Sequence, residues 1–367
     1  GNINLSNEEQ NVYHVIYSAK DADYTGEQKV LLDGVTIQDG RTLKEVGDVQ
    51  DAPKGRGGGI YSNGVHYTVV NSRLLNNKAV RGGAAFIQNA DLTLVNSMVA
   101  GNETWKEGNI VTNKNASGGG VFVISIDGGK SSLKAVNTLW ANNESVEAGG
   151  AIGAEGAGAS IDLMNNTFVM NKAENDAMLY HTAATMDNVK VVNTMMWGNE
   201  SIDDKVKNVT VIYSASDRDY SLSEGKSLFG PENGYNNIFL SKDNLALDGP
   251  RFAEPSTKTG LDGYNLNSKW NPIAVSPLTD HGNGMKNPAG DNYVGEEQAY
   301  RDWFITNAPE YADKYMLSPD YLRYSGPNQE NGDPDNKPID IGVYEYQYVL
   351  EFSKMDKIYV ATESCGK

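Results

Sequence analysis

Acidic side chains are the residues of this chain best suited to chemistry, provided that two of them face each other. Hydrolysis of a glycosidic bond needs two carboxylates, one on each side of the scissile bond. The sequence offers an isolated pair, Asp203 and Asp204, but none of the further signatures of polygalacturonase-like hydrolases. A lyase would need clustered Asp for Ca²⁺ and a nearby basic residue. Asp187 and Lys190 are residues of these types, but the two lie close together in the sequence and would supply too few such groups.

The four histidines and the single cysteine point to structure rather than to a metal centre. His14 and His66 sit in alternating strand patterns, while His181 follows Tyr180 and His281 belongs to a turn motif. With Cys365 as the lone cysteine, no internal disulfide can form and a zinc site is disfavoured.

Charge and hydropathy restrict the partners. The net charge is −17 and the sequence pI about 4.7, so the surface repels nucleic acid, which binds to basic faces. No apolar run approaches the ~20 residues of a membrane span. We therefore expect no nucleic acid and no membrane insertion by this chain. We also expect no cofactor, with Ca²⁺ on Asp and Asn oxygens as the alternative.

An asparagine phrase that returns five times determines the fold. Two apolar residues precede an Asn, and a second Asn follows six residues later, as in Val69–Asn77; Leu31–Asp39 is a degenerate copy with Asp in both places. The spacing predicts a stacked solenoid. We expect one Asn stack capped by Asp33, and a second stack beside it. The first stack comprises Asn71, Asn96, Asn137, Asn165 and Asn193; the second comprises Asn77, Asn102, Asn143, Asn171 and Asn199.

Glycine clusters mark where each coil begins. One precedes four of the phrases, for example Gly118–Phe122, and each leads into a short apolar run. A coil should therefore consist of a Gly-rich turn, a strand, a turn, a second strand, the Asn corner and a third strand. Such strands are stable only when stacked in parallel on the next coil. The fold class predicted is all-β, a right-handed single-stranded parallel β-helix of the pectin-lyase-like kind.

Loop lengths suggest where a ligand would bind. The links Gly40–Lys54 and Glu103–Ser117 are long, whereas Lys78–Arg81 between them is short. Two walls and a floor would result, and insertions in repeat proteins are often found on the binding face. The candidate ligand-binding residues there are Lys54, Arg56, Trp105 and Lys106. The alternative is that these are solvated loops without a role.

The rest of the chain divides into two further parts. Coils are expected over 1–220, and the sequence of Asn208–Tyr220 is similar to that of Asn11–Tyr24. Residues 221–347 are rich in Asn, Gly, Pro and Tyr, and should form an irregular C-terminal cap over the open end, with one helix at Val294–Tyr315. Residues 348–367 are a tail or the start of a following module.

The motifs resemble two groups of bacterial surface proteins. GGAI at Gly149–Ile152 with FVMN at Phe168–Asn171 resembles the repeats of chlamydial polymorphic outer membrane proteins. GPRFAEP at Gly249–Pro255, SPLTDHG at Ser276–Gly282 and DIGVYEYQ at Asp340–Gln347 resemble, in order, the choice-of-anchor Q region of Bacteroides-like surface proteins. Gly249, Thr279 and Val343 depart mildly from that pattern. The cap-motif residues are Asp280, Gly282, Asp340, Gly342 and Glu345, whose Asp side chains would accept N–H bonds in tight turns.

The resemblance implies an exported β-helix on the surface of a Gram-negative bacterium, attached to its outer membrane, and implies no activity. Our first hypothesis is a monomeric, non-catalytic module for adhesion or carbohydrate binding, whose partner is a carbohydrate or a host or neighbouring surface protein. Trp105, Trp140 and Trp197 are its candidate contacts, although the spacing of Trp140 and Trp197 favours core packing. The alternatives are a polysaccharide lyase or glycoside hydrolase on a coil face, and a structural spacer.

Overall fold

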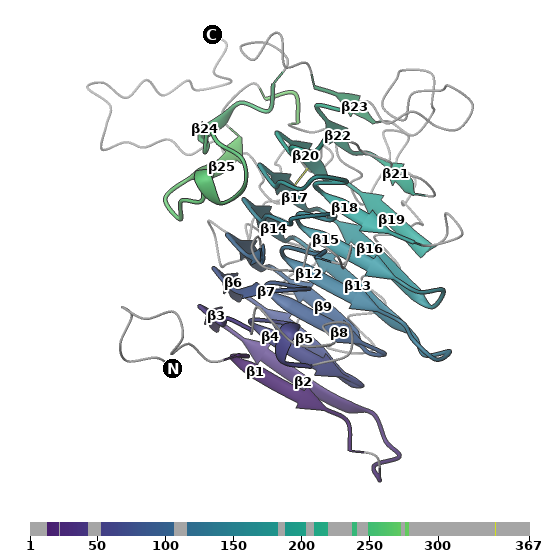
Figure 1. The fold of residues 1–367 in the computed structure, drawn as a ribbon. Coiled ribbons are helices and arrows are strands. Elements are labelled where there is room, and N and C mark those ends of the chain that lie inside the picture. The colour runs from purple at the N-terminus through teal and green to yellow at the C-terminus, as the bar shows by residue number, and fades with distance from the viewer. Residues whose placement is uncertain are drawn as a thin grey trace, which may run out of the picture.

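The computed structural model describes residues 13–21, 23–42, 53–105, 116–182, 188–202, 209–218, 237–240, 249–272, 276–278 and 342. These residues form a parallel β-helix, as the repeat predicted (Figure 1). Three parallel sheets run along the stack, and each coil from β1–β3 to β18–β20 contributes one strand to each sheet. No helix among the described residues combines the length and apolar character needed to cross a membrane.

We name the sheets A, B and C in the order in which the chain meets them. Sheet A contains β1 (Ile16–Ala19), β4 (Ile60–Asn63), β8 (Ala85–Gln88), β12 (Val121–Ile124), β15 (Ile152–Glu155) and β18 (Leu179–His181). Sheet B contains β2 (Gln28–Asp33), β5 (Val65–Val70), β9 (Asp91–Val95), β13 (Ser131–Val136), β16 (Ala159–Met164), β19 (Val189–Val192) and β21 (Thr210–Ile212). Sheet C contains β3 (Thr36–Gln38), β6 (Arg73–Leu75), β10 (Met98–Ala100), β14 (Leu139–Ala141), β17 (Thr167–Val169), β20 (Met195–Trp197), β22 (Ala215–Ser216) and β23 (Ile238–Phe239).

Four short strands and two 3-10 turns lie outside these sheets. They are β7 (Lys78–Ala79), β11 (Glu103–Thr104), β24 (Phe252–Glu254), β25 (Lys269–Pro272), η2 (Pro53–Gly55) and η5 (Gly260–Gly263). β7 and β11 pair in parallel at the turn after sheet C, whereas β24 and β25 form an antiparallel pair. Because β22 and β23 continue sheet C, the coils extend beyond residue 220.

The glycine clusters form the turns that enter sheet A. Gly82 has a φ of 63°, and a Cβ atom there would lie 2.2 Å from the carbonyl oxygen of Ala85. Gly57, Gly118 and Gly149 occupy the same position in other coils, with φ between 65° and 71°. Only glycine accepts both the left-handed backbone and the close approach of the next peptide. The cluster therefore specifies the corner, as the sequence indicated.

An apolar core fills the space between the three sheets. Its members alternate along the strands with outward residues and stack on apolar residues of the next coil. Trp140 is fully buried and stacks on Phe168 with ring centroids 5.4 Å apart. Trp197 is also buried, in a second apolar cluster beside sheet C. The expectation that these two tryptophans serve packing is confirmed.

The second predicted Asn stack forms a buried ladder. Both the backbone N–H and the side-chain amide of Asn102 donate to Oδ1 of Asn143, at 3.1 Å and 2.9 Å. Asn143 repeats this toward Asn171, and Asn171 toward Asn199. Each amide also donates to a backbone carbonyl of the preceding coil, such as Val99 for Asn143. Every coil thus caps its neighbour at the corner that follows sheet C.

The first predicted Asn stack lies at the corner between sheets B and C. All five of its members have φ between 48° and 53°, the left-handed region that Asn tolerates. Asn71 donates to the Asp33 carboxylate at 2.8 Å, which confirms Asp33 as the cap, and Asn137 donates to Asn96 at 3.2 Å.

The residue after the first Asn supplies a ladder that was not predicted. The backbone N–H of Ser72 donates to Oγ of Ser97, and that of Thr194 donates to Oγ of Ser214. These hydroxyls are buried, and several also donate to the carbonyl two residues earlier. The sequence signal was the small polar residue that follows Asn in the repeat.

The described part of the C-terminal region lies along the side of the coils. Ser256–Tyr264, which we call the flank segment, runs past the corners after sheet C: Thr259 donates to Glu200, the Gly260 N–H donates to the Met170 carbonyl, and Tyr264 lies against Gly101. Figure 1 shows the β24–β25 pair in green beside this edge. The predicted helix at Val294–Tyr315 and most of the predicted end cap lie outside the described residues.

Candidate functional site

Trp105 lies on the turn face that follows sheet C, within a small polar cluster drawn from three successive coils. The Lys78 ammonium lies 4.2 Å from the centroid of its indole ring, and Lys78 also pairs with Glu103 at 2.9 Å. The indole N–H donates to Oγ1 of Thr42 at 3.3 Å. A half-buried aromatic ring is thereby held beside a cation and a carboxylate. We call Thr42, Lys78, Glu103 and Trp105 the tryptophan corner.

The short link between the two long loops creates this corner. The Thr42 N–H donates to the Lys78 carbonyl, and the Trp105 N–H donates to the Ala79 carbonyl. On its other side, the Val80 N–H donates to the carbonyl of Gly55. The predicted floor therefore holds the described ends of both walls. The remaining loop residues, 43–52 and 106–115, lie outside the described residues, and Lys106 is among them.

The other two candidates take different places. Lys54 is exposed in η2, whereas Arg56 is 7% exposed, with its guanidinium carbon 4.9 Å from the centroid of the Phe86 ring. Arg81 repeats this arrangement over Phe122 one coil further on. Arg56 thus belongs to the packing on the outer face of sheet A.

An aromatic column runs along the outer face of sheet A. The rings of Tyr17, Tyr61, Phe86 and Phe122 stack in register, with successive centroids 5.1 to 5.8 Å apart. Burial, with the nearby Tyr17 hydroxyl as a smaller cause, raises the pKa of Tyr61. The stacked rings add contacts between neighbouring coils on this face.

Arg81 lies over a ring of this column and also pairs with a carboxylate. It pairs with Glu155 at 3.2 Å, and its side chain is 8% exposed. Burial raises the pKa of nearby Tyr180, and the charges of Glu155 and Glu147 raise it further. The pair neutralises charge in a partly buried setting rather than leaving a carboxylate ready to act as an acid or base.

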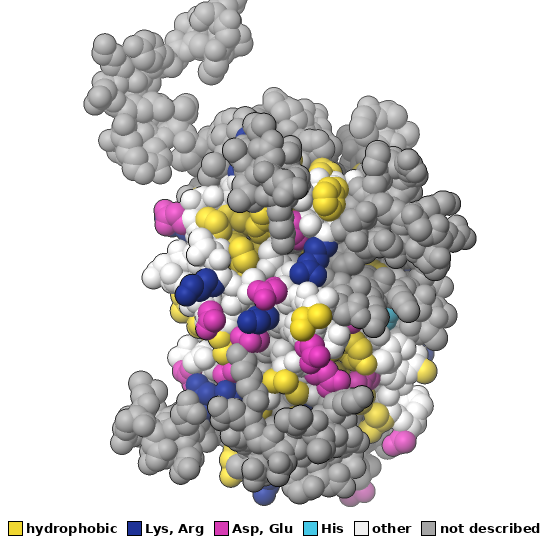
Figure 2. Space-filling model, turned by 45° about the horizontal axis from the view of Figure 1, so that its top comes forward, with side chains coloured by type: hydrophobic (Ala, Val, Ile, Leu, Met, Phe, Trp, Pro, Cys, Tyr) yellow, Lys and Arg dark blue, Asp and Glu magenta, His cyan; other side chains and the backbone are white. Residues whose placement is uncertain are grey.

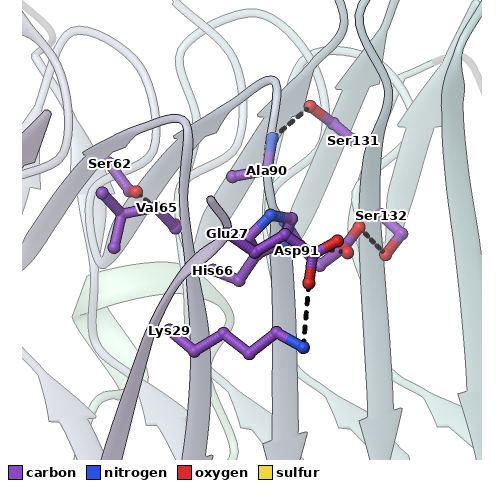
Figure 3. A network of polar contacts seen from close by, with 9 residues as sticks. All are labelled: Glu27, Lys29, Ser62, Val65, His66, Ala90, Asp91, Ser131 and Ser132. Atoms are coloured by element: carbon purple, nitrogen blue, oxygen red, sulfur yellow. Dashed lines mark hydrogen bonds and ion pairs between the residues drawn. The ribbon is translucent and has the colours of Figure 1, made fainter. Parts of the chain in front are cut away.

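A second polar network lies on the outer face of sheet B (Figure 3). Oγ of Ser132 donates to the Asp91 carboxylate at 2.5 Å, and Nδ1 of His66 lies 3.0 Å from the other carboxylate oxygen. Lys29 pairs with Glu27 beside them. The residue types are those of a Ser-His-Asp triad, but the carboxylate lies between the other two. This order puts the carboxylate, and not the imidazole, at the Ser132 hydroxyl, so it is not the arrangement of a catalytic triad.

The remaining residues that the sequence suggested as candidates either have structural contacts or lie outside the described residues. Nδ1 of His14 bonds to the Gly57 carbonyl at 2.9 Å, and Lys190 lies in register with Asp162 on sheet B. Gly342 donates its N–H to the carbonyl of Asn193, which places this cap-motif residue against the coils. Within the described ranges, no three His, Cys, Asp or Glu side chains are placed to hold a metal ion. The candidates outside the described residues are Asp187, Asp203, Asp204, Asp280, His281, Gly282, Asp340 and Glu345.

The turn face after sheet C carries a column of charged residues of both signs along the stack. The column contains Arg41, Lys78, Glu103, Glu144, Lys172 and Glu200, linked by parallel bridges from coil to coil. Figure 2 shows a face on which basic and acidic side chains lie interspersed. The Leu261 N–H donates to the Glu144 carboxylate at 3.0 Å, so the flank segment covers part of the column.

Comparison of this chain with protein-family models, with curated proteins and with solved structures finds no match to any of them.

Proposed function

We propose that the chain is an exported cell-surface β-helix module that binds carbohydrate at the tryptophan corner without cleaving it. The observation that carries this proposal is the position of Trp105. Trp140 and Trp197 pack in apolar clusters, whereas Trp105 is fixed on a turn face by Lys78 and Thr42. An aromatic ring beside a few oriented polar groups is a common arrangement in small-molecule sites.

Preorganisation supports binding at this corner. Lys78 is held by Glu103 on one side and the indole ring on the other, so little side-chain entropy remains to be lost when a ligand arrives. The net charge of −17 favours a neutral glycan over an acidic one.

The state of the carboxylates favours binding over catalysis. On the described coil faces, Glu103 pairs with Lys78, Glu155 pairs with Arg81, and Glu144 and Glu200 accept bonds from the flank segment. A hydrolase needs one carboxyl group that holds a proton and one that remains charged and accessible. Each of these four carboxylates is engaged by a cation or by a hydrogen-bond donor of the flank segment, and this suits a structural role.

A panel of neutral and acidic polysaccharides tests the proposal. Wild type should retain at least one neutral polysaccharide, and Trp105→Ala should weaken that binding about tenfold or more, the loss expected of an aromatic anchor. Tyr24→Ala removes an exposed aromatic residue of the first coil and is the matched control. Equal binding by wild type and Trp105→Ala would overturn the assignment of the site.

A further inference from the structure

The first coil of the solenoid has an open edge. β1, β2 and β3 are the first strands of their sheets, and among the described residues no strand pairs with their outer sides. Among the described residues, more of the exposed large hydrophobic side chains belong to this coil than to any other. They are Tyr13, Val15, Tyr17, Tyr24 and Leu31. Solenoids normally cover such an end, because bare strand edges recruit other strands.

The aromatic column of sheet A ends at this edge. Tyr17 stacks on Tyr61 with an interplanar angle of 7°, and Tyr17 is 56% exposed. Beside it, Ile16 is partly buried and packs against the core. The edge therefore offers one stacking position for an aromatic ring and one apolar position next to it, in the order apolar then aromatic.

The C-terminal segment of the chain carries this order of residues. β4 begins Ile60-Tyr61, β1 begins Ile16-Tyr17, and the two pairs lie in register. The same pair returns as Ile358-Tyr359, followed by Val360 and by an Ala, as in β1. Another Ile-Tyr pair, Ile212-Tyr213, already has a place in sheet B: Ile212 is the last residue of β21 and Tyr213 follows it.

We propose that residues 357–362 of the chain's own C-terminal segment add to sheet A as a parallel strand alongside β1. Ile358 then lies on Ile16, and Tyr359 stacks on Tyr17 to extend the column. The interaction is strand addition at a sheet edge, in which the backbone supplies affinity and the alternating side chains supply register.

The chain is long enough to do this within one molecule. Gly342 is held at the carbonyl of Asn193, in the coil of β19 and β20. The roughly 15 residues from there to Lys357 span up to ~50 Å when extended. Six coils at ~4.8 Å each separate that coil from the position beyond β1, a distance of ~30 Å. An attached strand also acts at a high effective concentration, which favours it over a second copy.

Cysteine pairing tests the register. In a Cys365→Ser background, Ala19→Cys is combined with Ala361→Cys, since the proposed register places these two residues opposite each other on the outer face. The control combines Ala19→Cys with Val360→Cys, because neighbouring residues of a strand point to opposite faces. We expect the Ala361 pair to form an intramolecular disulfide about tenfold faster than the control pair in mild oxidant. Non-reducing gel mobility reads out the products.

The other outcomes overturn the proposal. Equal rates for the two pairs, or no disulfide in either, mean that the segment does not dock in this register. Disulfide-linked dimers mean that a second copy occupies the edge instead. Because cysteine variants can perturb folding, a second measurement uses the intact strand: Tyr359→Ala should speed amide hydrogen exchange in residues 16–19 while leaving exchange in β13 unchanged. Unchanged exchange in residues 16–19 would contradict docking.

Discussion

The side-chain amide of Asn102 and its backbone N–H both donate to one oxygen of Asn143, at 2.9 Å and 3.1 Å. That oxygen belongs to the next coil, so each link in the ladder ties two coils together across the buried corner. Four such links follow one another from Asn77 to Asn199.

Asn143→Ala should destabilise the protein by about 3 kcal/mol, because it removes the acceptor of the buried Asn102 backbone N–H and a side-chain donor to the Val99 carbonyl. Chemical denaturation monitored by circular dichroism measures the change. Asn267→Ala is the control, since Asn267 is exposed and donates only its backbone N–H, to Asn265. A shift below about 0.5 kcal/mol for Asn143→Ala, the range of ordinary surface changes, would mean that the ladder contributes little.

Gly101→Ala should cost more than Gly34→Ala. Both glycines have a left-handed φ, of 63° and 70°, so each alanine carries about 1 kcal/mol of backbone strain. Around Gly34 a Cβ atom meets nothing within 4 Å, whereas at Gly101 it would lie 2.6 Å from the ring of Tyr264. Adding Tyr264→Ala should remove the extra cost of Gly101→Ala. Additive costs in this double-mutant cycle would show that the flank segment does not rest on Gly101.

Glu144→Ala should loosen the flank segment, because the Leu261 N–H loses its carboxylate acceptor in a partly buried place. Trypsin cleavage at the exposed Lys258 should become several-fold faster, as local opening becomes more frequent. Glu254→Ala removes a carboxylate that makes an exposed pair with Lys269, and should leave the cleavage rate unchanged. The same rate for both variants would contradict the role of Glu144.

Acidification should weaken the first coil through His14. Burial lowers the pKa of this imidazole below 6.5, although its bonds with the Gly57 and Arg56 backbone oppose the shift. The unfolded chain therefore binds a proton at a higher pH than the folded chain does. The contribution of His14 is fully present above pH 6.5 and falls as pH drops through that value toward the folded pKa.

Hydrogen exchange in β1 measures this dependence. Exchange, corrected for its intrinsic pH dependence, should speed up between pH 7.5 and pH 5.5 in wild type. The acceleration should shrink in His14→Gln, which cannot take up a proton. An equal acceleration in the two proteins would assign the effect to another group.

The sequence predicted the coils well because the same physical constraint recurs in each of them. Asn at a left-handed corner, glycine at a tight turn and short apolar strands repeat together, so one copy explains the others. The hydroxyl ladder through Ser72 and Ser97 was missed because a small polar residue at a corner has many uses. The flank segment was missed because its bonds are made by backbone groups, such as the Gly260 and Leu261 amides, which carry no sequence signal.

The site was only partly predictable. Loop lengths correctly indicated that Trp105 and the short link meet, since parallel bridges bring those segments together. Arg56 was grouped with them because it is near in sequence, yet its side chain turns to Phe86 on the face of sheet A. Which way a side chain leaves a turn depends on the neighbouring coil, and the pattern of one coil does not specify it.

The most direct test of the central claim is to incubate the protein with each polysaccharide that it retains, with and without Ca²⁺, and to follow new reducing ends and unsaturated products. A binding module that does not cleave predicts that the polysaccharide is recovered at its original length from wild type and Trp105→Ala alike. Accumulation of either product with wild type would contradict it, and would direct the search to carboxylates on the coil faces.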